Sequence, residues 1–330
     1  MNNPPVPTIS REYASEAMAR IETAVGDIIR GKTEQIRLAV ACMVAEGHLL
    51  IEDRPGTGKT SLAKAIAGAI GGSVRRIQFT PDLMASDVTG VSVFDRDRVG
   101  FSFRQGPVFA NIVIADEINR ASPKTQSALL EVMEERQVTN DGFTHPLPHP
   151  FMVVATQNPF DFHGTYPLPE TQLDRFAMKL SLGYASRDAE LDVMARPDGH
   201  LLIDELEPVL PLGAFTHLIT AARAVAVSES MRHYVADVVE ATRQHADLRL
   251  GVSTRGTLVL LAVARALALS NGRGFVAPDD IAMLVQPVLA HRVAVTIDAE
   301  MEGTTAAQVL TRIVEQVPVP RSRTVAQRSA

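Results

Sequence analysis

The spacing of apolar residues along the chain changes character near residue 185. Before that point, short apolar runs alternate with segments of helical periodicity, and the runs span 48–53, 74–79, 111–116, 151–156 and 178–182. The third and fourth runs have apolar centres without polar alternation, which is typical of strands buried on both faces. Helical segments between such strands indicate an α/β fold with a mostly parallel sheet. We predict an αβα core with five strands over residues 11–185.

After residue 185 the apolar positions repeat with the period of a helix. The segments FTHLITAARAV, ESMRHYVADVVEATRQHA and TRGTLVLLAVARALAL place apolar residues three or four positions apart. Pro278 and the two aspartates after it mark a helix start, because proline fits the first turn and acidic side chains complement the helix dipole. We predict a smaller all-helical domain over 186–317, with mobile tails at 1–10 and 318–330.

A glycine-rich turn, RPGTGKTS, joins the first predicted strand to the helix after it. Gly56 and Gly58 allow backbone N–H groups to face phosphates, and the helix N-terminus adds a favourable dipole. In such a loop Lys59 reaches the β- and γ-phosphates, and the Thr60 hydroxyl ligates magnesium. The consensus G-x-x-x-x-G-K-[ST] has glycine where this chain has Asp53, whose carboxylate we expect to turn away from the nucleotide. The alternative is a turn that only caps a helix.

Two carboxylates occur where the run at 111–116 ends: Asp116 is its last residue and Glu117 follows it. Ligands of open α/β sheets bind at this carboxyl edge. We expect Asp116 to hold magnesium through water and Glu117 to polarise the attacking water, because a general base must stand beside the metal rather than on it. Two acids at a solvated strand end are the alternative, so this assignment depends on the phosphate loop that precedes them.

Amide side chains, Gln157 and Asn158, follow the run at 151–156. An amide at this point can bind the γ-phosphate or orient the attacking water between the two strands. Since Pro159 comes next, a simple Asn-Pro turn is the alternative. We predict that one of these amides senses the γ-phosphate.

Two arginines are candidates for contact with the γ-phosphate. Arg175 precedes the last predicted strand, where it can act on the nucleotide of a neighbouring subunit. Its alternative role is an internal salt bridge with Asp174 or Glu170. Arg255 begins a helix of the second domain and can reach back over the γ-phosphate of its own chain. Its alternative is a solvated first-turn arginine, although a cation is slightly unfavourable at a helix N-terminus.

Composition narrows the classes of protein that can carry these motifs. Lys and Arg number 32 against 38 Asp and Glu, and the resulting net charge of −6 argues against a dedicated nucleic-acid-binding protein. The one cysteine, Cys42, lies in an apolar helical run and cannot form an internal disulfide. The longest apolar run is interrupted by Arg265 and is too short to span a bilayer. We therefore expect a cytoplasmic protein without an export signal.

Several longer segments occur together over most of residues 25–275: EDRPGTGKT, FTPDLMASDVTG, GPVFANIVIADEINRASPKTQSALLEVMEE, ATQNP, YPLPETQLDRF and STR. In combination they resemble the MoxR group of AAA+ ATPases, whose branch also contains magnesium-chelatase ATPase subunits and MCM helicases. Members of this group commonly read EDxPGxGKT, so Asp53 is typical of them. The group usually reads SPR where this chain has Ser253, Thr254 and Arg255, a mild departure that keeps the arginine.

The resemblance implies a P-loop NTPase core and an AAA+ lid, assembled as a homo-oligomeric ring, usually a hexamer, with ATP and Mg²⁺ as cofactors. The implied phosphate-loop contacts are Pro55, Gly56, Thr57, Gly58, Lys59, Thr60 and Ser61. The other implied roles are the Walker B pair for Asp116 and Glu117, sensor 1 for Asn158, the arginine finger for Arg175, sensor 2 for Arg255 and the adenine-side turn for Gly31. Arg120 lies near the expected subunit boundary and has no assigned role.

Two insertions also follow from the resemblance. Residues 91–107 would form a loop that interrupts the second core helix, and residues 137–150 would form a hairpin before the sensor strand. Both would face the ring pore. The first insertion carries Arg96, Arg98 and Arg104, which a nucleic-acid motor of the MCM type would use for binding.

The function implied by the resemblance is remodelling or maturation of a client protein, driven by ATP hydrolysis at subunit interfaces. MoxR relatives typically act with a separate von Willebrand factor A domain partner, and their clients are often metalloenzymes. Two alternatives remain open at this point: the nucleic-acid motor, which the acidic balance disfavours, and a chelatase subunit that drives metal into a tetrapyrrole.

Overall fold

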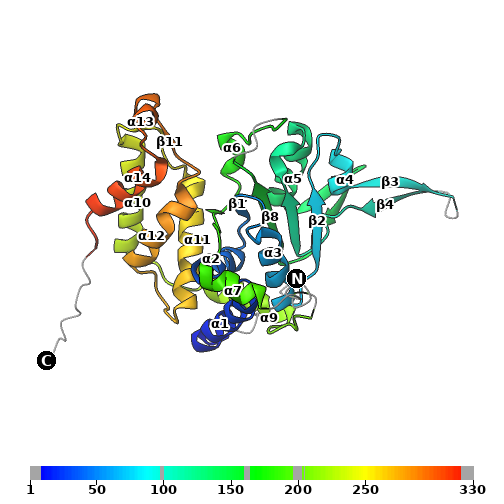
Figure 1. Ribbon diagram of the computed structural model, residues 1–330, viewed down its shortest axis with the longest axis horizontal. Helices are drawn as coiled ribbons and strands as arrows, with labels where there is room; N and C mark the ends of the chain where they lie inside the picture. Colours follow the sequence, from blue (N-terminus) through cyan, green and yellow to red (C-terminus); the bar gives the residue numbers. More distant parts are fainter. Residues whose placement is uncertain (1–8, 97–99, 160–163, 196–202, 204, 321–330) are drawn as a thin grey trace.

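The computed structural model describes residues 9–96, 100–159, 164–195, 203 and 205–320. Its α/β part contains a five-stranded sheet with the order β2-β5-β8-β1-β9, in which all neighbours are parallel (Figure 1). The strands are β1 (Leu49–Glu52), β2 (Val74–Gln78), β5 (Ile112–Asp116), β8 (Met152–Gln157) and β9 (Met178–Leu180). The five predicted runs are therefore confirmed as strands of one sheet. Most of the two predicted tails lies outside the described residues.

Helices cover both faces of the sheet. They are α1 (Arg11–Ile28), α2 (Thr33–Val44) and α3 (Lys59–Ala69) on one face, and α4 (Ala85–Thr89) and α5 (Pro123–Glu135) on the other. Successive residues of a strand point to opposite faces, so Ile112 and Ile114 of β5 pack with the first group and Val113 and Ala115 with the second. This two-sided burial explains why the central runs lack polar alternation.

The described residues of the insertion 91–107 are mostly two paired antiparallel strands, where the sequence analysis predicted a loop. Its strands are β3 (Gly90–Asp95) and β4 (Gly100–Gln105), and they project from the sheet domain (Figure 1). Val91, Val93 and Phe101 alternate with other residues along the two strands, which is the period of a β-strand. Glycine is required at the base, because a Cβ on Gly90 would lie 2.4 Å from the Arg104 carbonyl oxygen. Arg98 lies outside the described residues.

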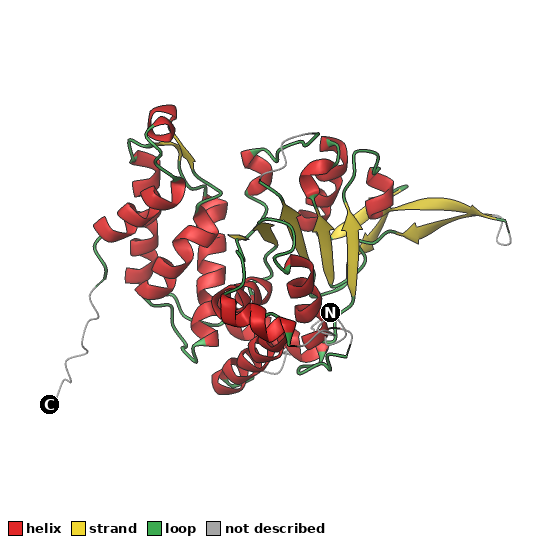
Figure 2. Cartoon of the chain, viewed as in Figure 1, coloured by secondary structure: helices red, strands yellow, loops and turns green. Residues whose placement is uncertain are grey.

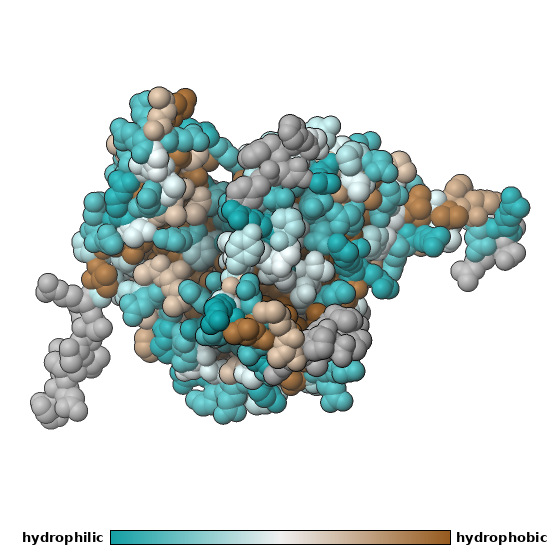
Figure 3. All heavy atoms as spheres, in the orientation of Figure 1, coloured by the Kyte–Doolittle hydropathy of each residue, from teal (hydrophilic) through white to brown (hydrophobic). Residues whose placement is uncertain are grey.

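Residues 137–150 contain the predicted second hairpin, formed by β6 (Gln137–Asn140) and β7 (Phe143–Pro146). The two hairpins contact each other, since the rings of Phe103 and His145 stack with centroids 4.2 Å apart. Beyond that contact the first hairpin exposes Phe94 and Phe101, whose side chains are 51% and 76% accessible. Apolar residues are visible along this hairpin in Figure 3.

The remaining part, residues 205–320, is mainly helical and is called the lid below (Figure 2). Its helices are α9 (Leu212–Arg223), α10 (Glu229–Gln244), α11 (Thr254–Ser270), α12 (Pro278–Leu284), the π-helix η2 (Val285–Leu289), α13 (Ile297–Met301) and α14 (Ala306–Gln316). The predicted helix start at Pro278 is confirmed. The all-helical prediction is wrong in one detail, because β10 (Leu248–Leu250) and β11 (Ala294–Val295) pair as a small antiparallel sheet.

The lid and the α/β part share one apolar cluster. Helix α11 packs against α1, α2 and α9, and Cys42 is fully buried in this cluster, in keeping with its apolar helical run. Burial raises the pKa of Cys42 to about 12, so the thiol stays protonated. Within the described part of the chain, no helix has both the length and the apolarity needed to cross a bilayer.

Candidate active site

The phosphate loop lies between β1 and α3, at the carboxyl end of the sheet. Gly56 and Gly58 adopt left-handed backbone conformations, with φ of 82° and 87°, which explains the need for glycine there. Lys59 begins the helix, and its Nζ donates hydrogen bonds to the carbonyl oxygens of Asp53 (2.9 Å) and Arg54 (2.7 Å). Partial burial lowers the pKa of Lys59. The Lys59 side chain therefore bonds to carbonyl oxygens of its own loop. The two left-handed glycines give the loop backbone the curvature that anion binding requires.

Asp53 points away from the phosphate side, as predicted. Its Oδ2 accepts hydrogen bonds from the backbone N–H groups of Leu182 (2.7 Å) and Gly183 (2.6 Å), and its Oδ1 accepts one from Arg54 (2.9 Å). Burial alone would raise the pKa of Asp53, but these backbone donors outweigh burial and lower it. The carboxylate thus remains ionised and ties the phosphate loop to the chain that follows β9.

One cavity of about 390 Å³ brings most of the predicted residues together. Its lining consists of Pro55, Gly56, Thr57, Gly58, Lys59, Thr60, Ser61, Arg76, Gln78, Asp116, Glu117, Thr156, Gln157 and Asn158. The strand ends of β5 and β8 place the acids and amides beside the phosphate loop because all these strands run parallel. Arg76 and Gln78 of β2 line the same cavity, although no motif in the sequence marks them.

The buried carboxylate Asp116 is the centre of the polar contacts in this cavity. It accepts hydrogen bonds from Thr156 Oγ1 (3.2 Å) and Thr60 Oγ1 (3.4 Å), and Arg76 Nε lies 2.5 Å from its Oδ2. A hydroxyl and a carboxylate so close together suit Mg²⁺, which prefers oxygen ligands and takes the rest from phosphates and water. Among the described residues no group of three or more His, Cys, Asp or Glu could hold a metal by itself.

Glu117, the expected general base, is held from two sides. Gln78 Nε2 donates a hydrogen bond to its Oε2 (2.9 Å), and Arg120 Nε lies 3.1 Å from the same oxygen. The backbone of Glu117 has a left-handed φ of 55°, and its N–H donates to Thr156 Oγ1 (3.0 Å). Arg120, which had no assigned role in the sequence analysis, therefore pairs with Glu117 in this structure.

A second cavity, of about 670 Å³, adjoins the phosphate loop and has room for the base of a nucleotide. It shares Gly56, Thr57, Gly58 and Ser61 with the first cavity, and residues 27–30, Lys32 and Tyr184 line its far side. Gly31 lies in the turn between α1 and α2 with a φ of 72°. A Cβ at Gly31 would lie 3.1 Å from that of Ala189, so this turn requires glycine on two grounds.

Arg175 and Arg255 lie together, away from the phosphate cavity. Arg175 precedes β9 and is thus at the amino end of the sheet, whereas the phosphate loop follows the carboxyl end of the parallel strand β1. Arg175 Nη1 donates to the Leu130 carbonyl oxygen (2.7 Å) and lies 2.8 Å from a carboxylate oxygen of Glu134. Both arginines line a separate cavity of about 190 Å³.

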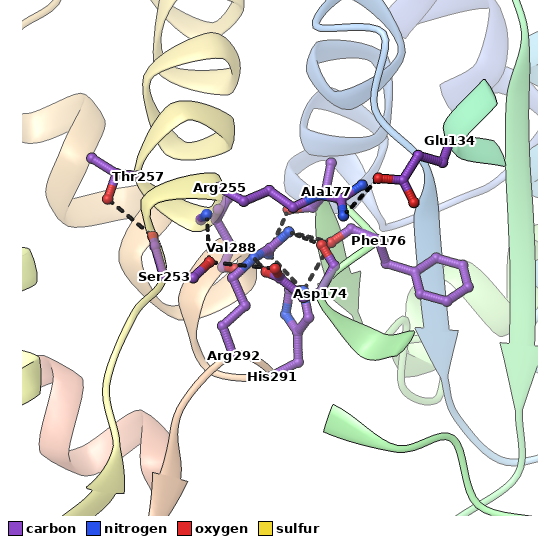
Figure 4. Close-up of polar contacts among 11 residues, drawn as sticks. Glu134, Asp174, Phe176, Ala177, Ser253, Arg255, Thr257, Val288, His291 and Arg292 are labelled. Carbon is purple, nitrogen blue, oxygen red and sulfur yellow. Dashed lines mark hydrogen bonds and ion pairs between the residues drawn. The ribbon is translucent and has the colours of Figure 1, made fainter. Parts of the chain in front are cut away.

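The expected position of Arg255 over its own phosphate loop is wrong for this structure. Arg255 Nη1 lies 3.2 Å from Glu134, and the side chain points to that residue in Figure 4. The direction of Arg255 follows from the docking of α11, whose N-cap residue Ser253 contacts Asp174. The internal partner suggested for Arg175, either Asp174 or Glu170, is also incorrect, since that partner is Glu134.

Comparison with known proteins agrees with this architecture. Residues 48–178 match the ATPase family associated with various cellular activities (AAA), and residues 240–313 match the AAA lid domain. The Chaperone MoxR1 of Mycobacterium tuberculosis is 38% identical, over 91% of this chain and 81% of its own length. Protein MoxR of Paracoccus denitrificans is 31% identical, over 82% and 87% of the two chains.

Two further relatives also match over most of the chain. YeaC of Bacillus subtilis, an uncharacterised protein, is 47% identical over 91% of this chain and 93% of its own length. The crystal structure of a candidate ATPase from Cytophaga hutchinsonii is 35% identical, with a TM-score of 0.88 over 94% of this chain and 97% of that one. The likeness therefore extends through both the α/β part and the lid.

Proposed function

This chain belongs to the MoxR family of AAA ATPases. From that premise we propose that it forms a ring, which hydrolyses ATP between neighbouring subunits to remodel client proteins, and that a monomer lacks this activity. One observation carries the proposal. The residues suited to bind and cleave ATP line one cavity, whereas Arg175 and Arg255 line another near the opposite end of the sheet. If a neighbouring subunit docks its phosphate cavity against these arginines, the arginines complete the ATP site of that neighbour.

Each residue of the phosphate cavity has a role in this proposal. Lys59 neutralises phosphate charge, and Asn158 contacts the γ-phosphate from the end of β8. Mg²⁺, when bound by Thr60 and Asp116, would polarise the phosphate oxygens. Glu117 then accepts a proton from the attacking water, once Gln78 and Arg120 allow its carboxylate to turn.

The neighbouring subunit supplies positive charge where negative charge grows during cleavage. Arg175 is the arginine finger of the proposal, a device worth roughly 10³ to 10⁵ in rate where it operates. Because Arg255 lies beside Arg175 on Glu134, we assign Arg255 to the same neighbouring nucleotide. The rate of hydrolysis therefore depends on how neighbouring subunits of the ring dock.

The product of the cycle is mechanical work on another protein. The exposed aromatic residues Phe94, Phe101 and Phe143 of the two hairpins offer a client an apolar surface. A hexamer, a separate von Willebrand factor A domain partner, metalloenzyme clients and a cytoplasmic location complete the proposal. They follow from likeness to the MoxR relatives.

Mixed rings test the proposal. Lys59→Ala removes the phosphate contact of a subunit but leaves its arginines, and Arg175→Ala does the reverse. We expect each variant alone to be inactive and an equal mixture to regain hydrolysis, because some interfaces then pair an intact phosphate loop with an intact arginine. Arg232→Ala, an exposed arginine of α10, serves as the control and should stay active. A mixture that remains inactive would contradict action between subunits.

A further inference from the structure

Arg292 of the lid is directed at the segment that carries Arg175. It lies between η2 and β11, and its side chain is only 1% exposed. Its Nη2 donates to the carbonyl oxygens of Asp174 (3.1 Å) and Phe176 (2.6 Å), and its Nε donates to Asp174 Oδ1 (2.8 Å). These contacts bind the residues on either side of Arg175 (Figure 4).

The third guanidinium nitrogen, Nη1, also donates hydrogen bonds to backbone carbonyl oxygens. Nη1 donates to the Ala177 carbonyl oxygen (3.2 Å) and to that of Val288, which belongs to the lid itself. A guanidinium is planar and presents its donors in a fixed fork, so several acceptors at once determine the orientation of the peptide groups that it binds. Arg292 therefore fixes both the position and the direction of the backbone around Arg175.

Neighbouring residues of the lid strengthen this contact. His291 Nε2 lies 3.0 Å from the Phe176 carbonyl oxygen, and burial together with the charge of Arg292 lowers the pKa of His291 to about 3. The ring is thus neutral and adds no second charge. Ser253, at the start of α11, donates from Oγ to Asp174 Oδ2 (3.3 Å). Two separate parts of the lid hold the same short segment.

The first turn of α11 is shaped around Arg292. A Cβ at Gly256 would lie 2.9 Å from Cδ of Arg292, so glycine leaves the space that this side chain occupies. Gly256 follows Arg255 directly, and Arg255 shares Glu134 with Arg175. The lid contact, the start of α11 and both arginines therefore form one continuous packed unit.

We propose that Arg292 is a positioning residue for Arg175: it fixes where the lid of a subunit holds the arginine that this subunit presents to its neighbour. Arg292 touches no nucleotide itself. A movement of the lid shifts the segment 174–177 and thereby the reach of Arg175. The inference rests on the proposed action of Arg175 between subunits, and it adds a connection from the lid to that residue.

The test uses Arg292→Met in the full-length chain, since methionine keeps much of the volume and loses the fork. We expect normal ATP binding by the variant and a loss of hydrolysis on the order of 10²-fold, the size expected for a misplaced catalytic group. Mixed with Lys59→Ala, the variant should regain activity, because its own phosphate loop is intact. Mixed with Arg175→Ala, it should not, because both variants then lack a correctly placed arginine.

Two further variants make the outcomes decisive. Arg312→Gln removes an exposed lid ion pair with Asp247 and should change nothing. Asp174→Asn keeps the backbone acceptors and should show a smaller loss with the same mixing pattern. If Arg292→Met does not fold, Asp174→Asn decides the question by the same mixtures.

The possible failures can be told apart. Wild-type hydrolysis by a folded Arg292→Met ring overturns the inference. So does a defect that Lys59→Ala subunits cannot rescue while they do rescue Arg175→Ala, because the defect then lies in the variant's own site or assembly. If Lys59→Ala rescues neither variant, the proposed action between subunits fails, and the inference fails with it.

Discussion

Arg175 and Arg255 come from different parts of the fold, yet both pair with the carboxylate of Glu134, at 2.8 and 3.2 Å. Glu134 lies in the last turn of α5, three residues before the β6–β7 hairpin begins at Gln137. The proposed contact of both arginines with the phosphates of a neighbouring subunit requires that they leave this carboxylate. In that proposal, Glu134 and the incoming triphosphate compete for the same pair of arginines.

We predict that Glu134→Gln lowers the ATP concentration needed for half-maximal hydrolysis. The side chains of Arg175, Arg255 and Glu134 are 29%, 42% and 39% exposed, so water screens both ion pairs. Pairs of this kind contribute about 1 kcal/mol or less, which corresponds to at most about fivefold in the half-saturating concentration. Steady-state ATPase measurements over a range of ATP concentrations would show the shift.

Glu135→Gln is the matched control for this change. Glu135 lies in the same helical turn, so removal of its charge has the same effect on the helix dipole but leaves both arginines paired. We expect its half-saturating ATP concentration to equal that of the wild type. An increase in the Glu134→Gln variant would indicate that Glu134 orients the arginines for catalysis instead of competing for them.

Arg76 pairs with the carboxylate that we propose as a magnesium ligand, so the two cations would compete for Asp116. Its Nε lies 2.5 Å from Asp116 Oδ2, one of the oxygens next to the Thr60 hydroxyl. We predict that Arg76→Gln lowers the Mg²⁺ concentration for half-maximal hydrolysis by about fivefold, because the Arg76 side chain is 55% exposed and water screens its charge. The measurement is a Mg²⁺ titration of ATPase activity at saturating ATP.

Arg75→Gln provides the comparison for Arg76. Arg75 is the preceding residue of β2 and points to the opposite face of the sheet, yet the substitution changes the net charge equally. The Mg²⁺ requirement of this control should stay at the wild-type value. Equal shifts in both variants would assign the effect to overall charge rather than to Asp116.

Local motifs were enough to predict the phosphate cavity. Lys59 and Thr60 follow a strand directly, Asp116 ends another strand, and parallel neighbours bring such ends to one edge. Gln78 and Arg76 could not be found in this way, since they are alternate polar residues of the edge strand β2 and form no motif. Their role depends on which strand lies next to β5, and that is a property of the whole sheet.

The errors in the lid have a different origin. The sequence identified the helix that begins near Arg255, but the direction of that side chain depends on how α11 docks against α1, α2 and α9. Periodicity within one helix contains no information on such docking. The strands β10 and β11 have three and two residues, too few for a recognisable alternation. Both the direction of Arg255 and the small β10–β11 sheet depend on tertiary contacts, which no local sequence pattern encodes.

A second cluster of charges joins the β6–β7 hairpin to the lid through Glu46. The side chain of Glu46 is only 8% exposed, and its Oε1 lies 2.6 Å from Arg136 Nη1 and 3.1 Å from His149 Nε2. Arg223 of α9 pairs with the other carboxylate oxygen. One nearly buried carboxylate is therefore surrounded by two arginines and a histidine from three segments of the chain.

We predict that Glu46→Gln destabilises the fold by about 2 kcal/mol at pH 7, because hydrogen bonds to a charged group are lost. Burial raises the pKa of Glu46, but Arg136, His149 and Arg223 outweigh burial and lower it. The stabilisation is therefore present above the ordinary glutamate value of 4.5 and is lost as the pH falls through the lowered pKa. Denaturant unfolding of both proteins at pH 7 and at pH 3 measures the difference, which should shrink at the lower pH. A difference that persists unchanged in acid would show that packing, and not the ionised carboxylate, stabilises this junction.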